Sequence, residues 1–395
     1  MSDGGRERIV IVGGGPAARS AAEAYRDAGG AGTVTILARE DEPPYERPPL
    51  TKDFLRGESG REELPLADPS WYAEHDIELR TGTEATELDL TGEEVRTAAG
   101  EAFGFDRVLL ATGAEPTVPP IPGADAPLVQ TVRRIGDAER LAELGDGDRA
   151  LVVGSGFIGC EAAASLALRG AEVTLVTMEA APQAERLGEE VAARIAGWLE
   201  DLGVDLVLEA ELTAVDSAGD RAARARLSGG IEIVADRVLL ALGVERDTGL
   251  AEAAGIAVEN GIEVDATMAS ADPRVLAAGD SAFAFNASAG RRLRVEHWGE
   301  ALNMGAVAGR TLAGEEAAWD AVPGFWSTIG EQTIKYAGWG DGWDEHRFES
   351  GADGAFACWY GRGGELVGVV AHRDDAAYER GRRLIEERTA WSRSE

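Results

Sequence analysis

Two glycine-rich segments with the same layout constrain the fold of this chain more than any other feature. Residues 8–29, RIVIVGGGPAARSAAEAYRDAG, contain a short apolar run, a glycine cluster and an alanine-rich stretch, and the apolar run TVTILARE follows them. Residues 148–170, DRALVVGSGFIGCEAAASLALRG, repeat this order before AEVTLVTME. Each segment predicts a strand, a tight turn, a helix and a second strand. Because the strands are apolar along their length, helices should cover both faces of a parallel sheet. We therefore expect an α/β fold with two Rossmann-like units.

The glycine clusters predict the kind of ligand. The turn positions are Gly13, Gly15 and Ala18 in the first unit, and Gly154, Gly156 and Gly159 in the second. The first position permits a tight turn, the second lets backbone approach a pyrophosphate, and the third lets the helix pack on the strand. The helix N-terminus then faces the phosphates. Two such turns predict two bound dinucleotides. The residues beside the turns, Pro16, Ala17, Phe157 and Ile158, should also contact these ligands.

The length of 395 residues predicts several domains. We expect the first dinucleotide-binding domain to be discontinuous, at residues 1–115 and 245–322, with the second inserted at 116–244. From residue 323 to 395 the composition changes: aromatic and glycine-rich stretches are followed by AAYERGRRLIEER. These features predict a small α+β domain of antiparallel strands that ends in an amphipathic helix.

Composition narrows the class of protein. The formal net charge is −33, which argues against nucleic acid or an anionic membrane as a main partner. No apolar run approaches the roughly 20 residues of a membrane span, and the polar start MSDGGRER does not resemble a signal peptide. The two cysteines, Cys160 and Cys358, cannot build a disulfide framework. These facts favour a cytoplasmic protein, and no residues with metal-ligand spacing predict a metal site.

The segment PPYERPPLTK at residues 43–52 is unusual because it contains four prolines and ends in a lysine. Only two of the 38 basic residues are lysines, Lys52 and Lys335. Each proline fixes its own φ, and the residue before it is expected to be extended. Such a segment has little conformational entropy to lose, so it should present Lys52 at a defined place.

Several motifs together resemble one family over nearly the whole chain. YERPPLTK resembles the YxRPPLSK of ferredoxin reductases of the putidaredoxin, rubredoxin and biphenyl dioxygenase type, a group that includes apoptosis-inducing factor. VVGSGFIGCEAA, RVEHWGEALNMG, VPGFWS, and the ATG and AGD after later strands extend the likeness. The resemblance implies FAD in the first unit and NAD(P)H in the second. Since no cysteine follows the second strand, thiol chemistry beside the flavin is disfavoured.

The resemblance also implies site residues. Lys52 would lie by flavin N5 and pair with Glu161, while Trp298 would border flavin and nicotinamide; these three are the expected catalytic residues. Asp280 would hold the ribityl chain. The other residues expected to bind cofactor by this likeness are Arg47, Pro48, Ala111, Thr112, Gly113, Arg133, Gly243, Glu296 and His297. Arg47 and Arg133 could instead be solvated arginines.

Two positions depart from the family pattern. Arg39 stands where an acid usually binds the FAD ribose, and Glu40 could serve by a shift of one residue. Thr177 stands where NAD-type members often have an acid, and Glu179 lies 20 residues beyond Gly159, close to the spacing for a ribose 2′-hydroxyl contact. NADH is therefore favoured, with NADPH possible.

The implied function is hydride transfer from NADH to FAD, followed by single-electron transfer to a ferredoxin-type iron–sulfur protein that serves an oxygenase or a P450. Because ferredoxins are usually acidic, the acidic chain needs a basic docking patch, for which Arg291, Arg292 and Arg294 are candidates. Two other functions stay open: a redox-sensing effector like apoptosis-inducing factor, and a flavin or quinone reductase. The chain could be a monomer or a homodimer.

Overall fold

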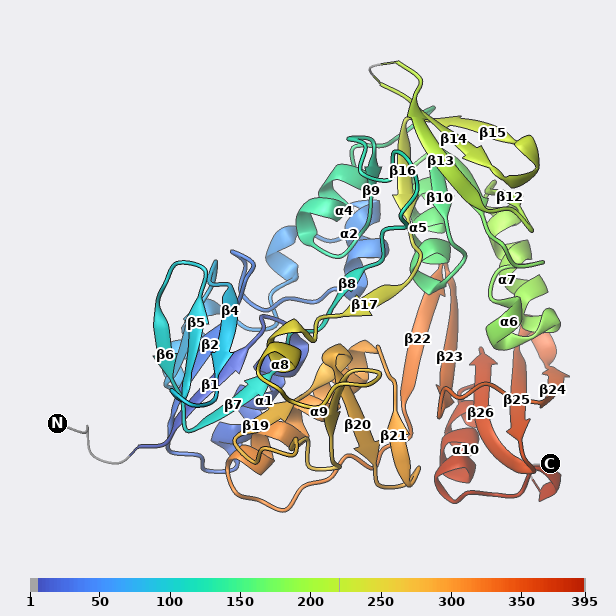
Figure 1. Ribbon diagram of the computed structural model, residues 1–395. Helices are drawn as coiled ribbons and strands as arrows, with labels where there is room; N and C mark the ends of the chain where they lie inside the picture. Colours follow the sequence, from blue (N-terminus) through green and yellow to red (C-terminus); the bar gives the residue numbers. More distant parts are fainter. Residues whose placement is uncertain (1–5, 220, 394–395) are drawn as a thin grey trace.

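The computed structural model describes residues 6–219 and 221–393. Two parallel sheets, each flanked by helices, occupy different ends of the molecule, and a sheet made by the C-terminal part of the chain lies beside both (Figure 1). The predicted α/β architecture with two Rossmann-type units and a C-terminal domain is confirmed. No helix among the described residues is long and apolar enough to cross a membrane.

The first parallel sheet has the strand order β19-β7-β1-β2-β3. Its strands are β1 (Arg8–Val12), β2 (Thr33–Leu37), β3 (Ile77–Arg80), β7 (Arg107–Leu110) and β19 (Val275–Ala277). The last strand follows the whole second unit in sequence, as a discontinuous domain requires. Helices α1 (Pro16–Asp27) and α9 (Trp298–Leu312) pack closely, since a Cβ on Gly305 would lie 2.4 Å from the carbonyl oxygen of Ala17.

The second parallel sheet has the order β12-β11-β10-β16-β9. Its strands are β9 (Val129–Gln130), β10 (Arg149–Val153), β11 (Glu172–Val176), β12 (Asp205–Val207) and β16 (Arg237–Leu240). Its helices are α4 (Ile135–Leu141), α5 (Phe157–Leu168), α6 (Ala184–Leu187) and α7 (Glu189–Asp201). The chain enters this unit through β8 (Ala114–Pro116) and leaves it through β17 (Val244–Arg246), and these two strands pair antiparallel. The exact domain limits stay a prediction.

Smaller elements complete the two units. They are β4 (Ala85–Asp89), β5 (Glu94–Thr97), β6 (Ala102–Gly104), β13 (Leu212–Ser217), β14 (Ala223–Leu227), β15 (Glu232–Ala235), β18 (Ile262–Val264), β20 (Ala282–Asn286), β21 (Arg291–Leu293), α3 (Pro69–Glu74) and α8 (Gly249–Ala253). The turns after the strands of both parallel sheets meet the C-terminal part of the chain at one cavity.

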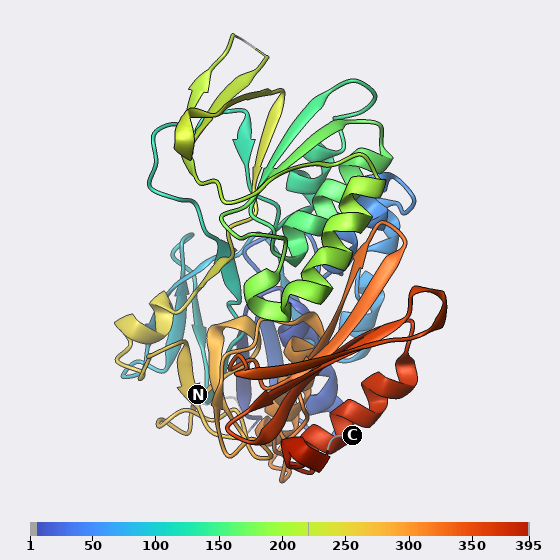
Figure 2. The same ribbon diagram turned by 90° about the vertical axis from the view of Figure 1, so that its right-hand side faces the viewer.

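The C-terminal part forms an antiparallel sheet of order β22-β23-β26-β25-β24. Its strands are β22 (Gly324–Ile329), β23 (Gln332–Gly338), β24 (Glu345–Ser350), β25 (Phe356–Arg362) and β26 (Glu365–His372), and α10 (Asp375–Glu386) follows. Figure 2 shows α10 running along this sheet, with its apolar side covered by strands β26 and β23. The predicted strands and terminal helix are both present.

The proline-rich segment differs from the expectation in one respect. Arg47, which precedes Pro48, has φ −87° and ψ −29°, and Pro48–Thr51 form a single 3₁₀ turn rather than an extended strand. Proline is tolerated in a first helical turn because its missing N–H has no partner there. The guanidinium of Arg47 is fixed by neighbouring acceptors, so tertiary contacts outweigh the local preference for an extended residue before proline.

Candidate active site

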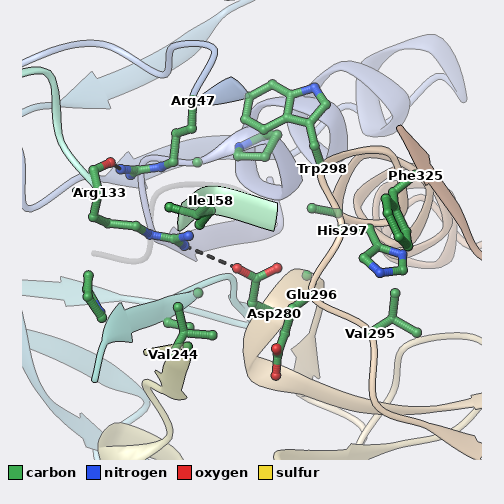
Figure 3. A pocket seen from close by; sticks show the side chains of 18 of the residues that line it. Arg47, Arg133, Ile158, Val244, Asp280, Val295, Glu296, His297, Trp298 and Phe325 are labelled. Carbon is green, nitrogen blue, oxygen red and sulfur yellow. Dashed lines mark hydrogen bonds and ion pairs between the residues drawn. The ribbon is translucent and has the colours of Figure 1, made fainter. Parts of the chain in front are cut away.

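A cavity of about 1140 Å³ lies where the carboxyl ends of the two parallel sheets meet the C-terminal sheet (Figure 3). Ligands of open α/β sheets bind at this edge of the sheet. Most residues that the sequence nominated line the cavity: Gly13, Gly15, Pro16, Ala17, Glu40, Arg47, Pro48, Lys52, Ala111, Thr112, Gly113, Arg133, Gly156, Phe157, Ile158, Glu161, Glu179, Gly243, Asp280, Glu296, His297 and Trp298. Ala18, Gly154 and Gly159 are not among its lining residues, and Ala18 and Gly159 are buried.

The glycine turns have the shape that a dinucleotide needs. Gly13 has φ +132°, and a Cβ there would lie 2.0 Å from the carbonyl oxygen of Ala111. Gly154 has φ +104°, and its Cβ would lie 2.3 Å from the carbonyl oxygen of Ala241. A Cβ on Gly15, in contrast, would meet no atom within 4 Å, so a ligand can come close to this backbone. Both turns therefore fit a pyrophosphate at the N-terminus of a helix.

Lys52 and Glu161 form a buried ion pair at the cavity wall, as the family resemblance implies. The distance from Lys52 Nζ to Glu161 Oε2 is 2.8 Å, and the two side chains are 11% and 7% exposed. Thr51 donates its hydroxyl to Glu161 Oε2 at 2.6 Å, while Ser327 donates its hydroxyl to Glu161 Oε1 at 2.8 Å. The backbone N–H of Thr328 also donates to Oε1, at 3.3 Å. The carboxylate is thus fully paired, which a buried charge requires.

Arg47 and Glu40 belong to a second polar cluster. Arg47 donates to Glu40 Oε1 at 2.7 Å, and Tyr45 donates to Glu40 Oε2 at 2.7 Å. Burial opposes ionisation of Glu40, but the charge of Arg47 and these hydrogen bonds outweigh it and lower the pKa of the carboxyl. Both oxygens of Glu40 therefore have partners already, and its role toward the FAD ribose stays a prediction. Arg39 pairs with Glu115 instead.

Arg133 and Asp280 face one another across the cavity (Figure 3). Arg133 Nη2 lies 3.1 Å from Asp280 Oδ2, although 147 residues separate them in sequence. The carbonyl oxygen of Arg133 accepts from Arg47 Nη1 at 2.6 Å. The two predicted FAD arginines and the aspartate of the AGD motif are thus brought together.

His297 and Trp298 stand at the start of α9. The His297 ring packs against Phe325 with a centroid distance of 4.6 Å (Figure 3). Its Nδ1 has no hydrogen-bond partner within the described residues. Burial, with a further contribution from the charge of Arg186, lowers the pKa of His297 to about 4. The imidazole is therefore neutral at pH 7.

Sequence reasoning missed a cluster of aromatic side chains. Phe325 from β22 lies 4.6 Å from Phe157 and 5.2 Å from Tyr336, centroid to centroid. The guanidinium of Arg186 stands 5.6 Å above the ring of Phe157. All four residues line the cavity. The FWS motif at 325–327 was the available signal, but the sequence could not show which wall it would form.

A carboxylate and the second glycine turn line the same cavity. Thr177 is buried, and its hydroxyl accepts a 2.7 Å hydrogen bond from the hydroxyl of Ser155, so it cannot reach a ribose. Glu179 lines the cavity, and its Oε2 accepts from the backbone N–H of Glu185 at 2.9 Å. A carboxylate held after the second strand is the arrangement that binds a ribose 2′-hydroxyl.

Neither cysteine lies at the cavity. Cys160 and Cys358 are free and buried, and burial raises the pKa of both thiols, that of Cys358 to about 12. A buried thiol of raised pKa is a poor nucleophile. Within the part of the chain that the structure describes, no three potential metal ligands come together.

The fold and this site match one family of flavoenzymes. Residues 7–305 match the family model described as pyridine nucleotide-disulphide oxidoreductase, and residues 324–395 match the reductase C-terminal family. The chain therefore belongs to the pyridine nucleotide-disulphide oxidoreductase family. It is an oxidoreductase that uses FAD and a nicotinamide nucleotide, as the sequence resemblance predicts.

Individual relatives refine this class. The chain is 33% identical to rhodocoxin reductase of Rhodococcus erythropolis over 91% of its own length and 85% of the relative. It is 35% identical to the anthranilate 1,2-dioxygenase system ferredoxin–NAD(+) reductase component of Burkholderia cepacia, over 81% of this chain and 79% of that one. Among solved structures, the covalent putidaredoxin reductase–putidaredoxin complex matches with a TM-score of 0.91 at 28% identity, covering 97% of this chain and 93% of that chain.

Proposed function

We propose that this enzyme is an NADH-dependent ferredoxin reductase that supplies an oxygenase or a P450. The observation that carries the proposal is the buried Lys52–Glu161 pair at a cavity that both glycine turns approach. The Burkholderia cepacia relative, which is named a ferredoxin–NAD(+) reductase component, supports the same acceptor. Bound FAD would supply the redox chemistry: acceptance of a hydride from NADH, and return of two electrons singly to two one-electron acceptors with release of a proton.

The residues of the chain supply position and charge for this chemistry. The turn at Gly13 and Gly15, with Arg47 and Arg133, would hold the FAD diphosphate and ribityl region beside Asp280. Lys52 places a positive charge at the cavity wall where negative charge develops on reduction. Its pairing with Glu161 keeps that ammonium from being an unpaired buried charge.

The turn at Gly156 and the carboxylate of Glu179 would receive NADH. A carboxylate favours a ribose 2′-hydroxyl and repels a 2′-phosphate. The aromatic rings of Phe157 and Phe325 give the cavity an apolar wall, which suits a stacked nicotinamide and excludes water.

Each of the three candidate docking arginines has an acidic partner. Arg291 pairs with Asp341, Arg292 lies 3.5 Å from Glu263, and Arg294 lies 2.9 Å from Glu296. Of the three, only Arg294 lines the large cavity. We assign docking to the cavity mouth around Arg294, where an acidic iron–sulfur protein would come close to the flavin.

Anaerobic reduction tests the proposal. The FAD-loaded protein is mixed with NADH, and the flavin absorbance is followed; a purified [2Fe–2S] ferredoxin, ferricyanide and a soluble quinone are then compared as acceptors. We expect NADH to bleach the flavin and the ferredoxin to be reduced catalytically. Turnover with quinone and none with ferredoxin would assign the protein to the flavin or quinone reductases instead.

A further inference from the structure

The carboxylate of Glu161 joins three parts of the chain that are far apart in sequence. Thr51 belongs to the turn Pro48–Thr51, Glu161 belongs to α5, and Ser327 belongs to β22. The end of strand β22 reaches α5, and the two elements are in contact (Figure 1). Taken as whole residues, Thr51, Glu161 and Ser327 are only 6%, 5% and 1% exposed.

The donors divide evenly between the two carboxylate oxygens. Lys52 and Thr51 donate hydrogen bonds to Oε2, at 2.8 and 2.6 Å. Ser327 and the backbone N–H of Thr328 donate to Oε1, at 2.8 and 3.3 Å. Donors on both oxygens fix the carboxylate plane, because rotation about the last side-chain bond would break hydrogen bonds on both sides. The position of Oε2, and with it that of Lys52 Nζ, is thereby determined.

The backbone of Thr51 is also held in place. Ser165, one turn beyond Glu161 on α5, donates its hydroxyl to the carbonyl oxygen of Thr51 at 2.7 Å. The turn that carries Thr51 and Lys52 is thus tied to α5 by three hydrogen bonds, from Ser165, Thr51 and Lys52.

We propose that Ser327 and Thr51 are positioning residues for the Lys52–Glu161 pair. The inference rests on the proposed function, since it assumes that Lys52 acts on bound FAD. It assigns a task to the C-terminal part of the chain, whose Ser327 completes the polar network of the flavin site. Flavin reduction then depends on how β22 is seated against α5.

A double-mutant comparison tests this role. Ser327→Ala and Thr51→Val each remove one hydroxyl donor, and Thr51→Ser retains the donor with less bulk. Each is made in the wild-type and the Lys52→Met backgrounds, and the rate of flavin reduction by NADH, the NADH dissociation constant and the FAD midpoint potential are measured. Ser20→Ala is the control. Ser20 is buried like Ser327, but its hydroxyl donates to the carbonyl oxygen of Leu302, at 2.8 Å, and not to Glu161.

We expect Ser327→Ala and Thr51→Val to slow flavin reduction about 10-fold, a change of about 1.4 kcal/mol in the activation free energy. The NADH dissociation constant should stay within about twofold, and the midpoint potential should shift in the same direction as in Lys52→Met. Thr51→Ser should recover most of the rate. In the Lys52→Met background the two substitutions should have no further effect on the rate, because a positioning residue acts only through the group that it positions.

Two outcomes would overturn the inference while leaving the proposed function intact. One is a wild-type rate and midpoint potential in Ser327→Ala. The other is that Ser327→Ala slows flavin reduction by the same factor in the Lys52→Met background as in the wild type. Any effect of the control Ser20→Ala should be independent of Lys52 in this way. Such a result would mean that Ser327 only stabilises the fold. If NADH failed to reduce the wild-type flavin, the proposed function itself would be wrong.

Discussion

Lys52 Nζ lies 2.8 Å from Glu161 Oε2, although the two residues are 109 positions apart in sequence. The pair joins the end of the proline-rich segment to helix α5 of the second nucleotide unit. Replacing Lys52 by Met removes the positive charge and leaves the carboxylate with its neutral donors only. We expect flavin reduction by NADH to slow about 10- to 100-fold, and the FAD midpoint potential to become more negative because reduced flavin loses a nearby cation. Stopped-flow spectroscopy and potentiometry measure the two effects.

The chain supplies a matched control for this substitution in its only other lysine. Lys335 pairs with Asp375 at 2.7 Å on the surface, where its side chain is 41% exposed. Surface pairs contribute little to stability, so Lys335→Met should leave both measurements unchanged. Equal behaviour of the two variants would refute a role for Lys52 at the flavin.

Gly156→Ala probes the approach of NADH to the backbone. Gly156 has φ −61°, and a Cβ there would meet no atom of the protein within 4 Å. The fold should therefore accept the methyl group, whereas a pyrophosphate that contacts this backbone should not. We expect the KM for NADH to rise about 10-fold or more with FAD content unchanged, which corresponds to about 1.4 kcal/mol of binding free energy.

Gly15→Ala is the counterpart in the first unit, where a Cβ also meets open space. It should lower the retention of FAD rather than the affinity for NADH. Gly197→Ala in α7, which has no atom within 4 Å of its Cβ position either, controls for the change itself. If Gly156→Ala bound NADH as the wild type does, the second turn would not be the pyrophosphate site.

The parts of the site that could be predicted are those that local sequence determines. The tight turns require glycine at Gly13 and Gly154, because φ is positive there and a carbonyl lies close by. This requirement gives a fixed glycine spacing that can be recognised in the sequence. The ion pair of Lys52 with Glu161 was accessible only through resemblance to a family, because no local pattern connects the two residues.

The remaining features depend on packing between distant segments. Phe325 lines the cavity and Ser327 contacts Glu161 because β22 lies against α5. Nothing within FWS specifies that neighbour. Arg47 adopts a helical backbone conformation before a proline because Glu40 and the carbonyl of Arg133 hold its guanidinium. Local propensity is a weak guide where several tertiary contacts converge.

Glu179→Gln tests the choice of nucleotide. The carboxylate is held near the second glycine turn by the backbone of Glu185, and its charge should repel a 2′-phosphate. With the neutral amide, the ratio of kcat/KM for NADH to that for NADPH should fall about 10-fold, since one charged hydrogen bond is lost and one repulsion is removed. Glu172→Gln, at the opposite end of β11, removes the same charge and should leave the ratio unchanged. An unaltered ratio in Glu179→Gln would mean that another residue distinguishes the ribose 2′-hydroxyl from a 2′-phosphate.

His297 predicts a pH dependence of stability. Its pKa is about 4 in the folded protein because of burial and the charge of Arg186, against roughly 6.5 in an unfolded chain. Between these values the unfolded chain binds a proton that the folded protein does not, so the free energy of unfolding falls as pH falls from 6.5 toward 4. From pH 7 to pH 5 this contribution amounts to about 1–2 kcal/mol.

Replacing His297 by Asn should remove that part of the acid sensitivity. Chemical unfolding of wild type and variant at pH 7 and pH 5 gives the difference directly. His75→Asn is the control, since His75 follows α3 and does not line the cavity. An equal loss of stability on acidification in wild type and His297→Asn would show that the imidazole already binds a proton in the folded state.

Arg294→Glu tests docking at the cavity mouth. Arg294 is 57% exposed and pairs with Glu296, which lines the same cavity. On a chain with a net charge of −33, even one exposed cation near the flavin should matter for the approach of an acidic partner. We expect ferredoxin reduction at low ionic strength to slow about 10-fold, and ferricyanide reduction to slow much less, because a small diffusible acceptor needs no docked orientation.

Arg310→Glu controls for net charge, since Arg310 lies in the last turn of α9 and pairs with Glu315 on the surface. High salt should bring Arg294→Glu and wild type together, as screening weakens attraction between exposed charges. If Arg310→Glu slowed ferredoxin reduction as much as Arg294→Glu, the overall acidity of the chain would govern the encounter, and the cavity mouth would have no special part in it.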